Sequence, residues 1–117
     1  MFVYYYNFNA ATPEGVEAIK AVASFLAERY SGAMGSKGKI SNWVIGNEIN
    51  NNAEWNYAGE KELHAYVQEY MKAFRVFYTA IKSVNSTDRL YFSTDYNWTD
   101  PTANQVKYGA KDVIDTF

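Results

Sequence analysis

Apolar and polar residues alternate in blocks along this chain of 117 residues, and each block has the length of a helix or a strand. Residues Phe2–Tyr6 are aromatic and β-branched, a composition that favours a strand. Thr12 then precedes Pro13 and Glu14, a combination typical of a helix start. Apolar residues follow at alternating spacings of three and four, which predicts an amphipathic helix that ends near Gly32.

The second half of the chain repeats this order. The apolar run Trp43–Ile45 ends abruptly at Asn47 and Glu48, which predicts a strand that is buried on both faces and delivers a carboxylate to a sheet edge. A long apolar stripe predicts a second helix over residues 60–84, and Leu90–Thr94 is the next predicted strand. The remaining residues, Pro101–Phe117, are weakly patterned. A short helical turn or two is predicted there from Val106, Val113, Ile114 and Phe117.

The order of strand, helix, strand, helix and strand predicts an α/β fold in which parallel strands alternate with helices. In such sheets ligands gather at the carboxyl ends of the strands. Each predicted strand runs into polar residues, so we expect all of these side chains at one edge. They are Asn7, Asn9, Asn47, Glu48, Asp95 and Asn97. A carboxyl group flanked by amides and aromatic rings suits acid–base chemistry on a polyhydroxylated substrate.

Composition and charge narrow the classes of function. The net charge is −2 and no basic run is visible, which argues against a nucleic-acid partner. The chain has no cysteine and a single histidine, His64, so we expect no metal and no cofactor. Its apolar runs are too short to span a bilayer, and no signal peptide is visible. The compartment stays open, because a secreted or cell-surface parent with its leader removed would show the same sequence.

The run Trp43–Glu48 resembles the fourth-strand signature of clan A, a group of retaining glycoside hydrolases built as (β/α)8 barrels. In that clan an Asn-Glu pair closes strand four. The Glu is the acid/base, and the Asn contacts the sugar hydroxyl next to the scissile carbon. The wider sequence is similar to one bacterial family of glycosidases in this clan. The stretches that carry this similarity are Phe25–Ser31, Trp43–Asn50, Trp55–Tyr57, Arg75–Ser83 and Asp95–Trp98.

This resemblance implies a carbohydrate substrate, with Glu48 as the acid/base and Asn47 as its substrate-contacting neighbour. By position alone, it adds Trp55, Asn56, Asp95, Asn97 and Trp98 as candidates for contacts with the sugar. Retaining glycosidases need a second carboxylate about 5 Å from the first. In this clan that carboxylate closes strand seven, and the chain stops soon after what would be strand five. The resemblance therefore implies the acid/base half of a site.

The two clearest predicted strands are spaced like repeating units of a fold that is longer than this chain. Their starts, Asn42 and Arg89, are 47 residues apart. Eight such units exceed the roughly 250 residues of a typical barrel, of which this chain supplies only a part. We therefore expect residues 1–117 to form a single domain, a partial TIM barrel around strands 3 to 5, that is inactive alone. Uncovered sheet edges in such a piece predict self-association.

Two other interpretations stay open. A carbohydrate-binding or structural α/β domain without catalysis would rest on Trp55, Trp98 and the eleven tyrosines, whose rings suit sugar faces. A flavodoxin-like domain would need a Gly-rich phosphate loop after its first strand, and the sequence has none there. Structural explanations also exist for single residues: a salt bridge or loop cap for Glu48, a turn for Asn47, and a strand-end turn for Asp95.

Overall fold

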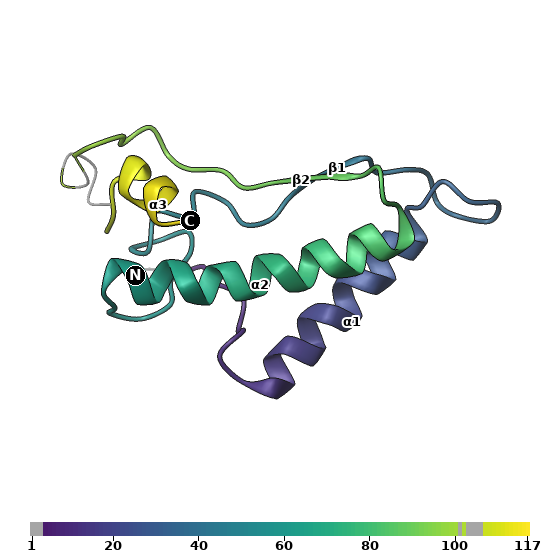
Figure 1. The fold of residues 1–117 in the computed structure, drawn as a ribbon, viewed down its shortest axis with the longest axis horizontal. Coiled ribbons are helices and arrows are strands. Elements are labelled where there is room, and N and C mark those ends of the chain that lie inside the picture. Colours follow the sequence, from purple (N-terminus) through teal and green to yellow (C-terminus); the bar gives the residue numbers. More distant parts are fainter. Residues whose placement is uncertain (1–3, 101, 103–106) are drawn as a thin grey trace. The chain divides into compact units, whose positions relative to one another are not determined.

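The computed structural model describes residues 4–100, 102 and 107–117. Its elements in chain order are α1 (Pro13–Arg29), β1 (Asn42–Val44), α2 (Leu63–Val84), β2 (Arg89–Tyr91) and α3 (Ala110–Thr116) (Figure 1). The expected mixture of helices and parallel strands is thereby confirmed in its coarse form, with three helices and one parallel pair of strands in this part of the chain.

The chain divides into two compact units. Unit 1 comprises residues 4–7, 46–71 and the described part of 92–117, and unit 2 comprises residues 8–45 and 72–91. Helix α2 contributes its first turns to unit 1 and its remaining turns to unit 2. The single domain expected over residues 1–117 stays a prediction.

Helix α1, in unit 2, begins where the sequence predicts it. The Thr12 side chain accepts a hydrogen bond from the Gly15 N–H at 3.1 Å, and Pro13 occupies the first turn, where its missing N–H costs nothing. The helix ends at Arg29, shortly before Gly32, whose φ of 78° turns the chain back. Both ends of α1 therefore follow from local chemistry.

Strands β1 and β2 form a two-stranded parallel sheet in unit 2 and are connected by α2. The register pairs Asn42 with Arg89, Trp43 with Leu90 and Val44 with Tyr91. The pairing extends one step further, because the Ile45 N–H donates to the Tyr91 carbonyl at 2.8 Å. Strand β2 is shorter than the predicted Leu90–Thr94, since the chain leaves the ladder after Tyr91.

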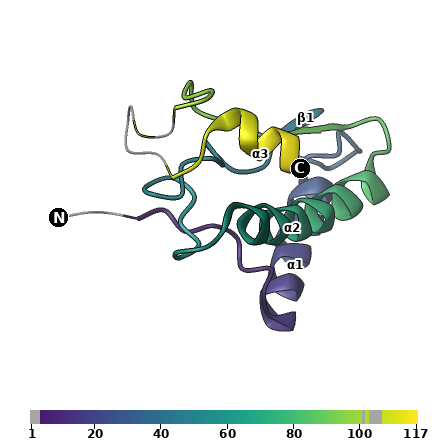
Figure 2. The same cartoon turned by 60° about the vertical axis from the view of Figure 1, so that its left-hand side comes forward.

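The core of unit 2 joins both helices to one face of the strand pair (Figures 1 and 2). Trp43 and Leu90, which are paired across the strands, pack against this core. The ring of Phe8 meets Phe77 edge-on at 4.8 Å between centroids. The buried members of the core are Ala10, Ile19, Ala23, Ala27, Ile45, Ala73, Phe77, Ala80 and Ile81.

Strand β1 is not buried on both faces, so that expectation is wrong. Successive side chains of a strand point to opposite faces. Trp43 and Ile45 face the helical core, whereas Val44 is 64% exposed and its cross-strand neighbour Tyr91 is 45% exposed. The described residues thus cover one face of the sheet and leave the face of Val44 open.

The expected third parallel strand is also absent from the described part of the chain. Tyr6 forms only an isolated parallel bridge with Tyr57. Tyr5 donates its N–H to the Glu54 carbonyl and accepts from the Tyr57 N–H, both at 2.8 Å. The Tyr5 ring stacks on Trp55 with 5.0 Å between centroids. These contacts within unit 1 explain why a strand-like sequence does not join β1. The first residues of the predicted strand lie outside the described residues.

In unit 1, α3 runs beside the first turns of α2 (Figure 2). The rings of Tyr66 and Tyr108 are 4.8 Å apart, and Val113 on α3 is fully buried. Helix α3 confirms the short helical turns predicted near the end of the sequence; Val106, which we also placed there, lies outside the described residues. Within the described range, no helix is long and apolar enough to cross a membrane.

Candidate functional site

The chain turns sharply in unit 1, where the sequence predicts the acid/base. Gly46 has a φ of 84° and Glu48 a φ of 45°, and Glu48 is the one residue other than glycine with a positive φ in the described part. This conformation costs about 1–2 kcal/mol. Hydrogen bonds hold it in place: the Glu48 N–H donates to Ser93 Oγ at 2.9 Å, the Ile49 N–H to the Ser93 carbonyl at 2.8 Å, and the Asn51 N–H to the Glu48 carbonyl at 2.7 Å.

The turn leaves both predicted site residues accessible. Asn47 is exposed and Glu48 is half-buried. The Glu48 carboxylate makes no ion pair and no hydrogen bond with any described residue. A salt bridge therefore does not explain this residue within the described structure. Three hydrogen bonds hold the backbone around Glu48, while its carboxylate is bonded to none of the described residues.

Two residues further on, Asn50 joins this turn to the segment that follows β2. Its Nδ2 donates to Asp95 Oδ1 at 2.6 Å and to the Tyr108 carbonyl at 3.1 Å, and its Oδ1 accepts from the Asp95 N–H at 2.9 Å. Asp95 also accepts from the side chain and the N–H of Asn97. Asn50 is fully buried, and these bonds satisfy its side chain. The two polar segments that the sequence places at one edge, 47–50 and 93–97, do meet.

Amide side chains also build the loop that follows. Asn52 is buried, donates to the Gly59 carbonyl at 2.8 Å and accepts from the Ala58 N–H at 2.7 Å. Asn56 is buried and donates to the Tyr66 hydroxyl at 2.5 Å. In this loop without regular structure, asparagine side chains hydrogen-bond to backbone groups, and these bonds replace the backbone pairing of a helix or sheet.

Tyr66 anchors this loop to the first turns of α2. Its hydroxyl lies 2.6 Å from the Ile49 carbonyl and 2.9 Å from the Asn56 carbonyl, and it donates to this pair. Burial raises the pKa of Tyr66, and the Asn56 amide opposes this only in part. Burial likewise raises the pKa of Tyr70, one turn further along α2. Both phenols therefore stay neutral well beyond neutral pH, and that of Tyr66 is a structural hydrogen-bond donor.

The predicted sugar-contacting residues lie in different environments. Trp55 and Trp98 are 40% and 53% exposed, so their rings are open to solvent. Asn56 and Asn97 are 2% and 5% exposed, and both are engaged in internal hydrogen bonds. Asp95 is half-buried and holds asparagine amides. Contacts of all five with a substrate stay predictions.

The polar residues after the predicted first strand make local hydrogen bonds of their own. Asn9 belongs to the start of α1, where it accepts from the Ala11 N–H at 3.1 Å and donates to Thr12 Oγ at 3.2 Å. Asn7 donates its N–H to the Tyr57 carbonyl at 2.9 Å. The described N-terminal residues form no strand with β1, and a shared edge of Asn7 and Asn9 with the other two strand exits stays a prediction.

Sequence reasoning assigned no role to Ser93 or Asp88, although a signal for both exists. Three side-chain contacts join residues separated by the same 45 positions: Trp43 with Asp88, Glu48 with Ser93, and Asn50 with Asp95. A constant offset is what a parallel pair of strands imposes on its flanking segments. The strands themselves pair at an offset of 47, as in Trp43 and Leu90, so aligning the two strand segments would have located these partners to within two residues.

The described residues hold no group of three or more side chains that could bind a metal ion. The comparison with curated proteins matches nothing, and neither does the comparison with solved structures. The model of a family of unknown function, DUF5722, matches residues 2–117. Since this match covers nearly all of the chain, the protein belongs to the DUF5722 family, whose function is unknown.

Proposed function

We propose that this chain carries the acid/base half of a retaining glycoside hydrolase site, on a part of a (β/α)8 barrel around strands 3 to 5. Glu48 is the acid/base, and Asn47 contacts the sugar beside it. The observation that carries the proposal is the conformation of Glu48, a non-glycine residue with φ of 45° whose carboxylate has no partner among the described residues. Backbone strain of this kind collects at active sites, where the surroundings enforce it.

The proposed chemistry uses the carboxyl group twice. As an acid, Glu48 gives its proton to the glycosidic oxygen while the bond to the anomeric carbon breaks. As a base, it takes a proton from the water that then releases the sugar. The carboxylate nucleophile, about 5 Å from the acid/base in retaining enzymes, comes from a later strand of such a barrel. We therefore expect the chain to bind sugar without turning over aryl glycosides.

The supports of Glu48 fit this role. An acid/base has to be held within a fraction of an ångström of its working position, which requires rigid support. Here Ser93 binds the backbone on both sides of the Glu48 peptide unit, and Asn50 and Asp95 fasten the same two segments two residues further on. The side chain is thereby left free on a fixed backbone.

Exposed aromatic rings in unit 1 support carbohydrate as the substrate class. Tyr96, Trp98 and Trp55 are 82%, 53% and 40% exposed. Aromatic faces stack on the apolar faces of sugar rings, and their polar edges tolerate water. Exposed rings of this size are otherwise a liability for a protein in water, so a ligand is a reason to keep them.

Titration of the labelled protein with a panel of oligosaccharides, followed by NMR, tests this proposal. We expect saturable shifts of the Glu48 and Asn47 backbone signals, weakened at least several-fold by Asn47→Ala. The matched control is Asn42→Ala, which removes another exposed asparagine from the same strand segment. Sugar binding that leaves residues 47 and 48 unmoved would overturn the proposal, and so would glycosidase turnover that survives Glu48→Gln.

A carbohydrate-binding role without catalysis is the second candidate. It is favoured by the stacked rings of Tyr5 and Trp55, which present a joint aromatic surface that is partly exposed. In this case Trp98→Ala or Trp55→Ala would abolish binding of oligosaccharides, whereas Glu48→Gln would leave the affinity unchanged. The same titrations therefore separate the two candidates.

A further inference from the structure

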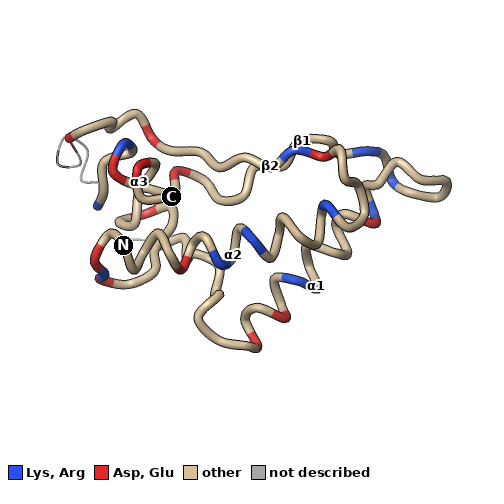
Figure 3. The backbone as a smooth tube through the Cα atoms, in the orientation of Figure 1, with Lys and Arg blue, Asp and Glu red and all other residues tan. Residues whose placement is uncertain are grey.

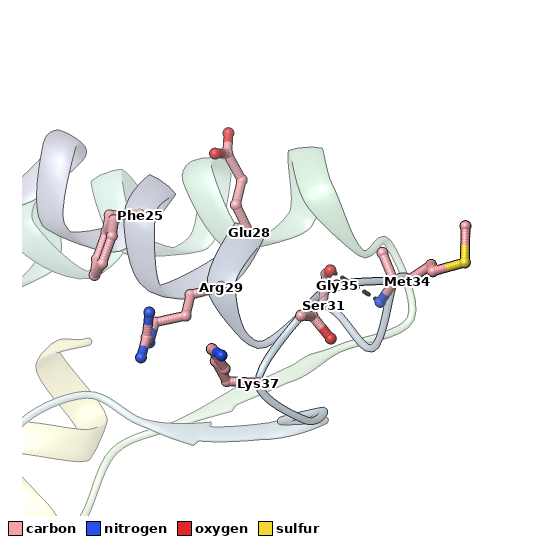
Figure 4. A pocket seen from close by; sticks show the side chains of 9 residues that line it. Phe25, Glu28, Arg29, Ser31, Met34, Gly35 and Lys37 are labelled. Atoms are coloured by element: carbon pink, nitrogen blue, oxygen red, sulfur yellow. Dashed lines mark hydrogen bonds between the residues drawn. The ribbon is translucent and has the colours of Figure 1, made fainter.

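A cavity of about 400 Å³ lies in unit 2, between the last turn of α1 and the hairpin that leads to β1. This hairpin comprises residues 31–39, and Ser31 and Lys39 form an antiparallel bridge at its base. It contains none of the residues considered so far for catalysis or sugar binding. Figure 4 shows the side chains that line it, among them Arg29, Lys37 and Phe25. This volume is within the usual range for a small-molecule site.

The hairpin is firmly tied to α1, which fixes the position of its lysine. The Lys37 N–H donates to the Arg29 carbonyl at 3.0 Å, and the Ile40 N–H donates to the Tyr30 carbonyl at 3.0 Å. The Gly32 N–H closes the base of the hairpin on the Gly38 carbonyl at 3.1 Å. Arg29 and Lys37 are therefore held as neighbours by backbone contacts and not by chance side-chain orientation.

Within the described part of the chain, the two neighbouring cations have no acidic partner. Neither Arg29 nor Lys37 forms an ion pair with any described residue. Glu28 is the one carboxylate that lines the cavity, and Figure 4 shows its side chain directed away from both cations. Like charges held side by side repel each other, and a bound anion removes this repulsion.

Aromatic rings orient the arginine. Its guanidinium carbon is 6.0 Å from the centroid of the Phe25 ring and 5.7 Å from that of Tyr30. A guanidinium held in this way keeps its planar fork of N–H donors in place for an oxyanion. Phe25 is 59% exposed and lines the same cavity, so it offers an apolar surface next to the charges.

The distribution of charge along the chain also favours an anionic ligand at this cavity. Eight of the eleven Lys and Arg residues lie in unit 2, together with only four of the thirteen Asp and Glu residues. Figure 3 shows the basic residues along α1, the hairpin and the later turns of α2. Unit 2 is thus positive within a chain whose net charge is negative. A positive surround raises the local concentration of anions at the cavity.

We propose that this cavity binds a small organic ester of phosphate or sulfate. Arg29 and Lys37 hold the oxyanion, and Phe25 contacts the organic part of the ligand. A cavity of about 400 Å³ is larger than a bare oxyanion needs, which is why the ligand is an ester and not the free ion. The site is independent of the proposed glycosidase function, because it uses residues of a different unit.

The test is NMR titration of the full chain with glucose 6-phosphate and glucose 6-sulfate, compared with inorganic phosphate, inorganic sulfate and glucose. We expect both esters to shift the signals of residues 29–38 at low ionic strength, with tighter binding than the inorganic ions and no shift with glucose. The ester that binds more tightly identifies the source of the oxyanion. Added salt should weaken binding, because the ion pairs are exposed.

Variants decide whether the named residues are responsible. Arg29→Gln and Lys37→Gln should each weaken ester binding about tenfold or more, as expected for loss of a charge-assisted hydrogen bond. Phe25→Ala should weaken the ester more than the inorganic ion. Lys20→Gln is the matched control on the same helix and should change nothing. Circular dichroism checks that each variant keeps its helices.

Two results would overturn the proposal. One is the absence of shifts at residues 29–38 with both esters at millimolar concentration in the wild-type chain. The other is unchanged binding in the double variant Arg29→Gln, Lys37→Gln, since the anions would then be attracted by unit 2 as a whole. Arg29→Lys adds a check on geometry, because it keeps the charge but removes the fork and should weaken binding in part.

Discussion

Asn50 and Asp95 hydrogen-bond to each other in both directions, side chain to side chain at 2.6 Å and backbone to side chain at 2.9 Å. They lie 45 residues apart and fasten the segments that follow the two parallel strands. Asn50 is fully buried and Asp95 is half-buried, and the bond from Asn50 to the Tyr108 carbonyl is buried as well. This pair therefore governs the stability of the turn that carries Glu48.

Asn50→Ala should lower the free energy of unfolding by about 2–4 kcal/mol. The substitution leaves Asp95 and the Tyr108 carbonyl without their buried partner, and unsatisfied buried groups cost about 1–3 kcal/mol each. Urea unfolding measures the change. Asn47→Ala, at an exposed position three residues earlier, should stay within about 0.5 kcal/mol of the wild type. Equal effects of the two variants would contradict the role given to Asn50.

Glu48→Gly should make the chain more stable, by about 0.5–1 kcal/mol. Glycine removes the cost of about 1–2 kcal/mol of the left-handed conformation and loses about 0.5–1 kcal/mol of extra chain entropy. Glu54→Gly, in the same loop but without a positive φ, is the control and should be destabilising. Thermal unfolding of both variants decides the matter. A loss of stability in Glu48→Gly would mean that the carboxylate has a structural partner.

The stability of the protein should fall as the pH rises above about 10. Burial raises the pKa of Tyr66 and Tyr70 in the folded chain, whereas unfolded tyrosine ionises near pH 10. The folded chain therefore keeps protons that the unfolded chain releases. The contribution of each residue is complete below pH 10 and is lost by about 1.4 kcal/mol per pH unit above it, until the folded-state pKa is reached.

Urea unfolding between pH 9 and pH 11.5 measures this slope. Tyr66→Phe should reduce the slope and also cost about 1–3 kcal/mol at neutral pH, because the Ile49 carbonyl and Asn56 lose their donor and acceptor. Tyr6→Phe removes an exposed hydroxyl and serves as the control at neutral pH. A stability that is constant across this range would show that the two phenols are not buried.

Trp43→Phe should lower the free energy of unfolding by about 1–3 kcal/mol. The Trp43 Nε1–H donates to Asp88 Oδ2 at 3.0 Å, and Asp88 is 2% exposed. Phenylalanine fills most of the same space but leaves the carboxylate without this donor. Trp43→Phe in the background Asp88→Ala should cost much less, and a double-mutant cycle measures the difference. Additive effects would contradict the coupling.

Self-association, which the sequence predicts, is proposed for the open face of the strand pair. Val44 and Tyr91 are cross-strand neighbours and are 64% and 45% exposed. Light scattering over a wide range of concentration should show oligomers, and Val44→Lys should shift them toward monomer. Val22→Lys, at a similarly exposed position on α1, is the control. Monomers at every concentration would exclude association through this face.

The elements with strong local signals were predictable. The start of α1 follows from Thr12 and Pro13, and α2 follows from its long apolar stripe. The parallel pairing of β1 and β2 follows from the order of the elements. The pairing of the first predicted strand was not predictable, because aromatic residues favour an extended segment without specifying which part of the chain it pairs with. Here Tyr5 finds its partners in Glu54, Trp55 and Tyr57 of a loop.

The candidate site was predictable in location and less so in detail. Glu48 and Asn47 stand out because an apolar run ends at them. Whether Asn56 or Asn97 points to solvent or to the interior depends on partners distant in sequence, such as Tyr66, and no local pattern encodes that. The positive φ of Glu48 was equally hidden, since glutamate has no preference for this conformation.

The uneven division of charge between the two units affects how the protein behaves during purification. A net charge of −2 suggests weak retention on an anion exchanger and none on a cation exchanger. Each resin, however, attracts whichever unit has the opposite sign, so near neutral pH the chain should be retained by both. Its elution will depend on local charge density, and the sum of all charges will predict it poorly.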